Sequence, residues 1–93
     1  MKKKIAILGS TGSIGKILLD IIDKDKKNFE IILLSANKDY KNLLKQAKKF
    51  KVKNLIITNN ESFRKLKKIN KKSEIKIFNT FKNYDEIFKK KNH

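Results

Sequence analysis

The sequence predicts an α/β fold in which the strands of a parallel sheet alternate with helices. Three observations support this prediction. Four short apolar runs are separated by longer segments whose apolar residues recur at helical spacing. The apolar runs are mostly continuous rather than alternating, which is typical of parallel strands buried on both faces. All three glycines of the chain lie in segment 9–15, between the first apolar run and the first helical segment.

The first strand is predicted at residues 4–8, an apolar run that stops at Gly9. A helix is predicted from residue 13 to about 25, because apolar residues recur there every three or four positions. These residues form one apolar stripe along the helix: Ile14, Ile17, Leu18, Ile21 and Ile22.

Three further strand–helix pairs follow. Strands are predicted at 29–34, 54–58 and, with charges interrupting it, 74–78, and helices at 40–50, 60–69 and 84–90. Asn60 is the candidate N-cap of the third helix. The inward-facing residues are expected to be Leu43, Leu44 and Ala47, then Phe63, Leu66 and Ile69, and finally Tyr84, Ile87 and Phe88. No Pro- or Ser-rich linker and no repeat divides the chain, so residues 1–93 are predicted to form one unit with amphipathic helices covering the sheet.

The composition excludes several kinds of site. The chain has no Cys, which removes disulfides, thiolate metal ligands and a Cys nucleophile. Its one histidine, His93, is the last residue and is expected to lie in a tail rather than to act as a base or ligand. No apolar run is long enough to cross a bilayer, and the apolar stretch after the N-terminal lysines is too short for a secretory signal. We therefore expect a cytoplasmic protein without a membrane partner.

The net charge of +16 favours loose association with polyanions, but it does not by itself indicate a nucleic-acid partner. Every basic side chain is Lys except Arg64, and Asn and Ile are also abundant. The codons of these three residues are rich in A and T, so the base composition of the genome explains the excess of Lys. A nucleic-acid-binding surface would be expected to use more Arg, whose planar fork pairs with phosphate and guanine.

The glycine segment 9–15 has the spacing and context of a dinucleotide-binding loop between a strand and a helix. Gly9 allows a sharp turn, Gly12 lets the backbone approach a pyrophosphate, and Gly15 lets the helix pack closely on the sheet. Free amides at the helix start, with the positive end of the helix dipole, favour an anion. This context makes the predicted fold Rossmann-like, a partial doubly wound sheet of about four strands. Further hydrogen bonds are expected from the hydroxyls of Ser10, Thr11 and Ser13.

An ATP-binding P-loop fits the same segment less well. Lys16 follows Gly15, but the residue five positions before Gly15 is Ser10 rather than Gly. Lys16 is followed by Ile17, so the hydroxyl that would bind magnesium is missing.

The end of the second strand is the other candidate site. In dinucleotide-binding domains an acid near this point commonly holds the ribose 2′-hydroxyl of NAD. Here Lys38 is suited to pair with a 2′-phosphate, and Ser35 or Asn37 to donate to it. This favours NADP over NAD, although Asp39 is an alternative ligand for a ribose.

A longer set of segments resembles one enzyme family. Segment 7–15, Ile-Leu-Gly-Ser-Thr-Gly-Ser-Ile-Gly, is the most specific, and the likeness continues through 19–22, 29–31, 34–38, 44–47 followed by Phe50, and 54–57. The sequence is similar there to 1-deoxy-D-xylulose 5-phosphate reductoisomerase. That family uses NADPH and a divalent metal to convert 1-deoxy-D-xylulose 5-phosphate to 2-C-methyl-D-erythritol 4-phosphate in non-mevalonate isoprenoid biosynthesis. The resemblance covers most of residues 1–70.

The resemblance implies an NADPH site in this chain. Segment 11–14 matches the loop that holds the pyrophosphate, and segment 37–39 matches the part near the adenosine ribose phosphate. Together with the motif analysis, the candidate cofactor-binding residues are Gly9, Ser10, Thr11, Gly12, Ser13, Ile14, Gly15, Ser35, Ala36, Asn37, Lys38 and Asp39. No catalytic or metal-binding residue is assigned.

The family's metal, Mg²⁺ or Mn²⁺, is held by an Asp-x-Glu motif and a later Glu in a second domain that also binds the sugar phosphate. This sequence has no Asp-x-Glu, and the adjacent Asp85 and Glu86 are interpreted as a solvated helix face. Residues 1–93 are therefore expected to be the N-terminal part of the cofactor domain, either truncated or a fragment of a longer gene product. Alone they are expected to be inactive, and the parent enzyme is expected to be a homodimer.

The alternative is a small basic nucleotide- or nucleic-acid-binding module without catalysis. It predicts salt-sensitive binding of DNA or RNA that survives a bulky residue at Gly12. An NADPH site predicts that such a residue abolishes dinucleotide binding, because a side chain would occupy the path of the pyrophosphate.

Overall fold

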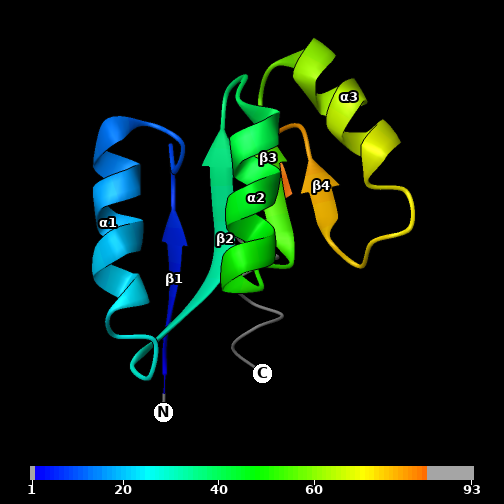
Figure 1. Ribbon diagram of the computed structural model, residues 1–93. Helices are drawn as coiled ribbons and strands as arrows, with labels where there is room; N and C mark the ends of the chain where they lie inside the picture. The colour runs from blue at the N-terminus through cyan, green and yellow to red at the C-terminus, as the bar shows by residue number, and fades with distance from the viewer. Residues whose placement is uncertain (1, 84–93) are drawn as a thin grey trace.

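The computed structural model describes residues 2–83, which form a parallel sheet with three α-helices (Figure 1). The expected helix at 84–90 lies outside the described residues. In chain order the elements are β1 (Lys3–Ile7), α1 (Ser13–Asp23), β2 (Phe29–Ala36), α2 (Tyr40–Phe50), β3 (Asn54–Ile57), α3 (Asn60–Ile69), β4 (Lys76–Phe78) and a short 3₁₀ turn, Phe81–Asn83. The predicted α/β class is confirmed, and the predicted strands and helices start and end within a few residues of the observed ones.

The sheet order follows the chain order, β1-β2-β3-β4, and every pair is parallel. The carboxyl ends of the strands therefore share one edge of the sheet, where the loops after β1, β2 and β3 meet. The register between β1 and β2 shifts once, because Ile5 pairs with Ile31 whereas Ala6 pairs with Leu33. The extra residue in β2, Ile32, forms a bulge that changes which residues face the helices.

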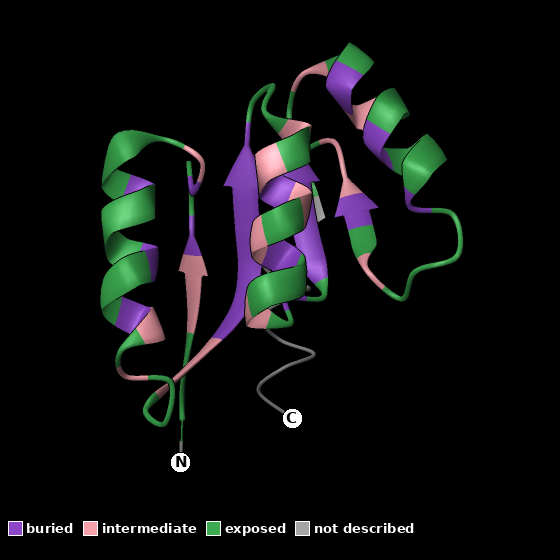
Figure 2. Cartoon of the chain, in the orientation of Figure 1, coloured by how far each residue is buried: buried purple, intermediate pink, exposed green. Residues whose placement is uncertain are grey.

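The main core lies between the sheet and the three helices (Figure 2). A smaller cluster lies on the opposite face of the sheet and consists of Ile32, Leu33 and Ile56, with Ala6 and Phe78 packed against them. The strands are thus buried on both faces, as their continuous apolar runs predict. The main cluster contains Ile7, Leu19, Ile22, Ile31, Leu34, Ala36, Leu43, Ala47, Val52, Leu55, Ile57, Leu66 and Ile77.

The apolar stripe predicted for α1 does not face the sheet. An amphipathic helix would bury this stripe, yet Ile14 is 76%, Ile17 58% and Ile21 57% exposed, and Leu18 is also exposed. The buried residues of α1 are Gly15, Leu19 and Ile22. Of the residues in the predicted stripe, only Ile22 faces inward.

Gly15 explains this rotation of α1. A Cβ at Gly15 would overlap the Gly9 carbonyl and lie 2.6 Å from the Ser10 Cα, so this face of the helix touches the backbone of the preceding loop. Once Gly15 faces inward, helical spacing also turns Leu19 and Ile22 inward, one and two turns later. The larger aliphatic side chains are left on the outer surface.

The other two helices follow their predicted faces more closely. In α2, Leu43 and Ala47 are buried and Leu44 packs against the core, as predicted. In α3, Leu66 is buried and Phe63 packs on the core. Ile69 is predicted to face inward but is exposed, because the buried face of α3 runs through Ser62, Leu66 and Asn70. The N-cap of α3 is Asn59 rather than Asn60, because the Asn59 side chain accepts a hydrogen bond from the Ser62 amide at 2.9 Å.

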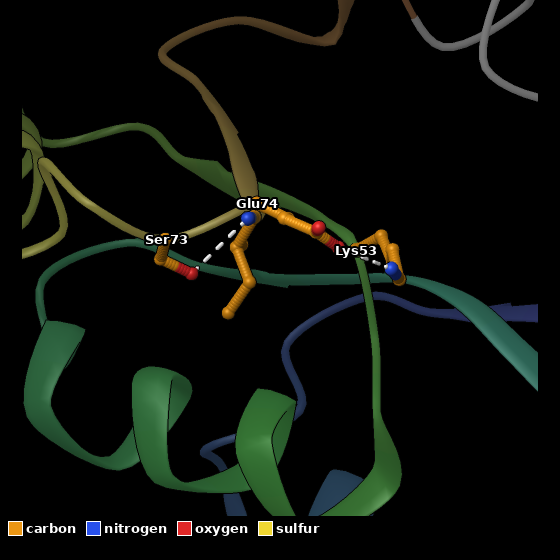
Figure 3. A network of polar contacts seen from close by, with 4 residues as sticks. Lys53, Ser73 and Glu74 are labelled. Atoms are coloured by element: carbon orange, nitrogen blue, oxygen red, sulfur yellow. Dashed lines mark hydrogen bonds and ion pairs between the residues drawn. The ribbon is translucent and has the colours of Figure 1, made fainter.

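The opposite edge of the sheet, where the strands begin, carries a small polar network (Figure 3). The Lys53 ammonium, just before β3, donates to the Glu74 carboxylate, before β4, at 2.8 Å. The Ser73 hydroxyl accepts from the Ile75 amide at 3.2 Å. The Lys53–Glu74 contact joins the starts of the two strands, the Ser73–Ile75 bond is local to the segment before β4, and both lie away from the glycine segment. In the described part of the chain, no helix is long and apolar enough to cross a membrane.

Candidate dinucleotide-binding site

The glycine loop turns the chain from β1 into α1, and Gly9 makes the turn. Its φ of +69° lies in the left-handed region, which favours glycine. The Gly12 amide donates to the Gly9 carbonyl at 3.1 Å and closes the loop on itself. The role predicted for Gly9 therefore matches its observed conformation.

The loop presents free backbone donors at the start of α1. Gly12 is the N-cap residue and, having no side chain, supplies no capping hydrogen bond. Within residues 2–83, the amides of Ser13, Ile14 and Gly15 have no hydrogen-bond acceptor. These amides and the positive end of the helix dipole suit an anion.

The surface around these amides is open. A Cβ added at Gly12 would have as its nearest neighbour only the Gly9 carbonyl oxygen, at 3.4 Å. The fold itself therefore does not require glycine at this position, whereas a ligand lying against the backbone would. Ser13 is exposed and Thr11 half-buried, so both residues are accessible from this surface.

Ser10 does not point to that surface. Its side chain is 0% exposed, and its hydroxyl donates to Gln46 Oε1 on α2 at 2.7 Å. Gln46 Nε2 in turn donates to the Ser10 carbonyl at 3.0 Å. The expectation that the Ser10 hydroxyl donates to a ligand is thus wrong, because that hydroxyl is already committed inside the protein.

Ser35 and Ala36, at the end of β2, are also buried. The Ser35 hydroxyl accepts from the Gly9 amide at 3.0 Å, and the Ser35 carbonyl accepts from the Ser10 amide at 2.9 Å. Ser35 therefore holds the glycine loop against β2, and its hydroxyl is not placed to donate to a ribose phosphate.

The next three residues, Asn37, Lys38 and Asp39, are exposed at the carboxyl edge. The Asp39 carboxylate caps α2, accepting from the Asn42 amide at 3.3 Å and from the Asn42 side chain at 2.8 Å. Asn37 Oδ1 accepts from the Thr58 hydroxyl at 2.8 Å. Lys38 is the cation in this segment, whereas the Asp39 carboxylate already has a structural role.

The titratable groups whose pKa is displaced lie elsewhere. A hydrogen bond from a lysine is the main reason that the pKa of three carboxyl groups is lowered: Lys26 acts on Asp23, Lys65 on Glu61 and Lys53 on Glu74. None of these carboxyl groups lies in segments 9–15 or 35–39. No group of three or more His, Cys, Asp or Glu side chains in residues 2–83 is close enough to hold a metal ion. The free amides at the start of α1 are suited to binding an anion.

Gln46 contacts Ser10 and Thr58 contacts Asn37, but neither is among the cofactor-binding residues predicted from the sequence. Gln46 carries a detectable signal, since it lies between Leu43 and Ala47 on the inward side of a helix that is otherwise rich in Lys. A polar residue in that position needs a buried partner. Thr58 follows the short apolar strand β3 and carries no comparable signal.

A family model described as 1-deoxy-D-xylulose 5-phosphate reductoisomerase matches residues 5–93. The curated enzyme of that name from Pelagibacter ubique is 53% identical over 90 residues, which cover 97% of this chain and 23% of the relative. The one from Phocaeicola vulgatus is 40% identical over 78 residues, covering 84% and 20%. The chain thus spans between a fifth and a quarter of the length of these relatives.

Solved structures of reductoisomerases are also similar to this chain. The reductoisomerase from Zymomonas mobilis in complex with NADPH superimposes with a TM-score of 0.77 at 29% identity, covering 84% of this chain and 21% of that one. A reductoisomerase in complex with NADPH, fosmidomycin and magnesium gives 0.80 at 25% identity, covering 91% and 21%. The match of the family model over almost the whole sequence, together with these relatives, shows that the chain belongs to the 1-deoxy-D-xylulose 5-phosphate reductoisomerase family.

Proposed function

We propose that this chain binds NADPH as the N-terminal cofactor-binding part of a 1-deoxy-D-xylulose 5-phosphate reductoisomerase. The observation that carries the proposal is the set of unpaired amides at the start of α1, next to a glycine that the fold does not require. Two family members have been solved with NADPH, and both are similar in fold to this chain. A dinucleotide supplies the diphosphate that such amides bind.

In this proposal different residues of the site bind different parts of the cofactor. The amides of Ser13, Ile14 and Gly15 bind the pyrophosphate, with the hydroxyls of Thr11 and Ser13 beside them. Asn37 and Lys38 lie at the adenosine ribose, where the Lys38 ammonium pairs with the 2′-phosphate and favours NADPH over NADH. Ser10, Ser35 and Asp39 act through the backbone and α2 rather than on the ligand.

The reaction proposed for the whole enzyme is the conversion of 1-deoxy-D-xylulose 5-phosphate to 2-C-methyl-D-erythritol 4-phosphate. NADPH supplies the hydride when bound. The described residues offer no ligand set for Mg²⁺ or Mn²⁺, so we propose that this chain binds the cofactor without turning over the sugar phosphate. A cytoplasmic location and a homodimeric parent enzyme belong to the same proposal.

The test is a titration of the chain with NADPH and with NADH, followed by nucleotide fluorescence. We expect NADPH to bind at least about tenfold more tightly, because only NADPH carries the phosphate that pairs with Lys38. Equal affinity for the two nucleotides, or no binding at low salt, contradicts the proposal.

The variant Gly12→Asp separates an effect on NADPH binding from an effect on folding. A carboxylate at the N-cap should keep or raise the thermal midpoint, because it caps α1 and complements the helix dipole. The same carboxylate should abolish NADPH binding, since it would lie where the pyrophosphate docks. The small basic module would instead be supported if the wild-type chain does not bind NADPH and if salt-sensitive binding of DNA or RNA persists in Gly12→Asp.

A further inference from the structure

The glycine loop is held from one side by a single side chain of α2. The Ser10 hydroxyl donates to Gln46 Oε1 at 2.7 Å, and Gln46 Nε2 donates back to the Ser10 carbonyl at 3.0 Å. The Ser10 amide is also engaged, because it donates to the Ser35 carbonyl at 2.9 Å. All three polar groups of Ser10 are therefore bound to β2 or α2.

This anchoring matters because of the residues around Ser10. Gly9 and Gly12 have wide conformational freedom, so a loop built on them would otherwise be mobile. A mobile loop would have to be ordered when a ligand binds, and that ordering reduces affinity. With Ser10 fixed, the amides that follow it are already in place for an anion.

Helix α2 also carries the other half of the candidate site. It begins at Tyr40, two residues after Lys38, and the carboxylate of the intervening Asp39 caps its first turn. Gln46 lies two turns further along the same helix. One rigid element therefore holds the glycine loop through Gln46 and the ribose-phosphate segment through its N-terminus.

We infer that Gln46 is a positioning residue for the dinucleotide site. It holds the glycine loop in the form that receives a diphosphate and sets the distance between that loop and Lys38. This inference rests on the proposed NADPH binding for its effect on affinity, but the order of the loop can be measured without any nucleotide.

The test compares two near-isosteric replacements of an amide by an apolar side chain. Gln46→Met removes both bonds to Ser10. The matched control, Asn54→Leu, removes a buried bond of the same kind far from the loop, from Asn54 Nδ2 to the Ile32 carbonyl at 3.0 Å. The readouts are the dissociation constant for NADPH, and amide hydrogen exchange of residues 9–15 in the free protein.

We expect Gln46→Met to weaken NADPH binding about tenfold and to speed exchange in the loop. Asn54→Leu should lower the thermal midpoint while leaving both readouts unchanged. Wild-type affinity and wild-type exchange in Gln46→Met would overturn the inference, and so would an equal effect of Asn54→Leu on the loop.

Two further measurements keep the outcome decisive. If Gln46→Met does not fold, Ser10→Ala removes the hydroxyl bonds to Gln46 Oε1 at 2.7 Å and to the Ser35 carbonyl at 3.4 Å, and it keeps the bond from Gln46 Nε2 to the Ser10 carbonyl. This variant should still speed exchange at residues 9–15; unchanged exchange there overturns the inference. If the wild-type chain does not bind NADPH, the proposed function fails. Faster loop exchange in Gln46→Met would then still support the positioning role, and unchanged exchange would refute it.

Discussion

Helices α1 and α2 have the same length and pack on the same face of the sheet, yet they use their residues differently. α2 buries Leu43 and Ala47, turns its lysines outward and is capped by Asp39. α1 has no side-chain cap, buries the small residue Gly15 and exposes Ile14, Ile17 and Ile21 (Figure 2).

The two helices therefore have different structural roles. α2 packs on the sheet and against α3, and its ends are satisfied within the chain, so it serves as a scaffold. The start of α1 is left unpaired and its position is set by a close backbone contact rather than by large apolar side chains. That arrangement gives up packing energy at the place where the candidate ligand site needs open amides.

Shortening one aliphatic side chain on each helix tests these different roles most directly. Leu43→Ala in α2 should lower the free energy of unfolding by about 2–5 kcal/mol, because Leu43 is fully buried in the main core. Ile17→Ala in α1 should change it by no more than about 0.5 kcal/mol. Chemical denaturation of both variants measures the two values, and a large loss for Ile17→Ala would show that the outer face of α1 is packed.

A second test addresses the contact that orients α1. Gly15→Ala should destabilise the chain by about 1–3 kcal/mol, because the added Cβ meets backbone atoms of Gly9 and Ser10 that cannot rotate away. Gly12→Ser is the matched control and should keep or raise stability, since the site is open and serine is a good N-cap. Equal denaturation midpoints for wild type and Gly15→Ala would refute our account of the rotation.

The smallest expected effect concerns the charged contact between the ends of the two helices. The Asp23 carboxylate of α1 lies 2.9 Å from Lys26 and 3.6 Å from Lys49 of α2. The hydrogen bond from Lys26, with the charges of both lysines, lowers the pKa of Asp23 below its ordinary value of 3.8. A lowered pKa means that the stabilisation is present above 3.8 and is lost as the pH falls through the folded-state pKa.

Thermal midpoints of the wild type and Asp23→Asn should therefore differ slightly at neutral pH and converge as the pH falls below 3.8. Glu61→Gln is the control, because Glu61 pairs with Lys65 within α3 and does not join α1 to α2. A difference between wild type and Asp23→Asn that persists in acid would argue against the charged contact.

Most of the fold could be predicted from the sequence because its signals are local. The strands are short apolar runs, and the bounds of α2 and α3 coincide with the predicted segments 40–50 and 60–69. The rotation of α1 could not be predicted in the same way. Helical periodicity selects the largest apolar stripe, whereas the close approach at Gly15 depends on backbone atoms of another segment.

The candidate site shows the same division. The open position of Gly12 and the turn at Gly9 follow from the glycine spacing, and the structure agrees with both. The burial of Ser10 and Ser35 could not be predicted, because their partners lie 25 to 36 residues away along the chain. A hydroxyl in a glycine-rich loop has the same sequence signal whether it faces a ligand or the protein interior.

The order of the strands has a consequence for how the chain folds during synthesis. Each described strand pairs only with its neighbours in the chain, so the described sheet can grow outward from β1 one unit at a time. Of the described elements, β1 and the glycine turn are made first, and β2 and α2 then supply Ser35 and Gln46 to hold the turn. The glycine loop can therefore reach its final shape before α3 and β4 have been translated.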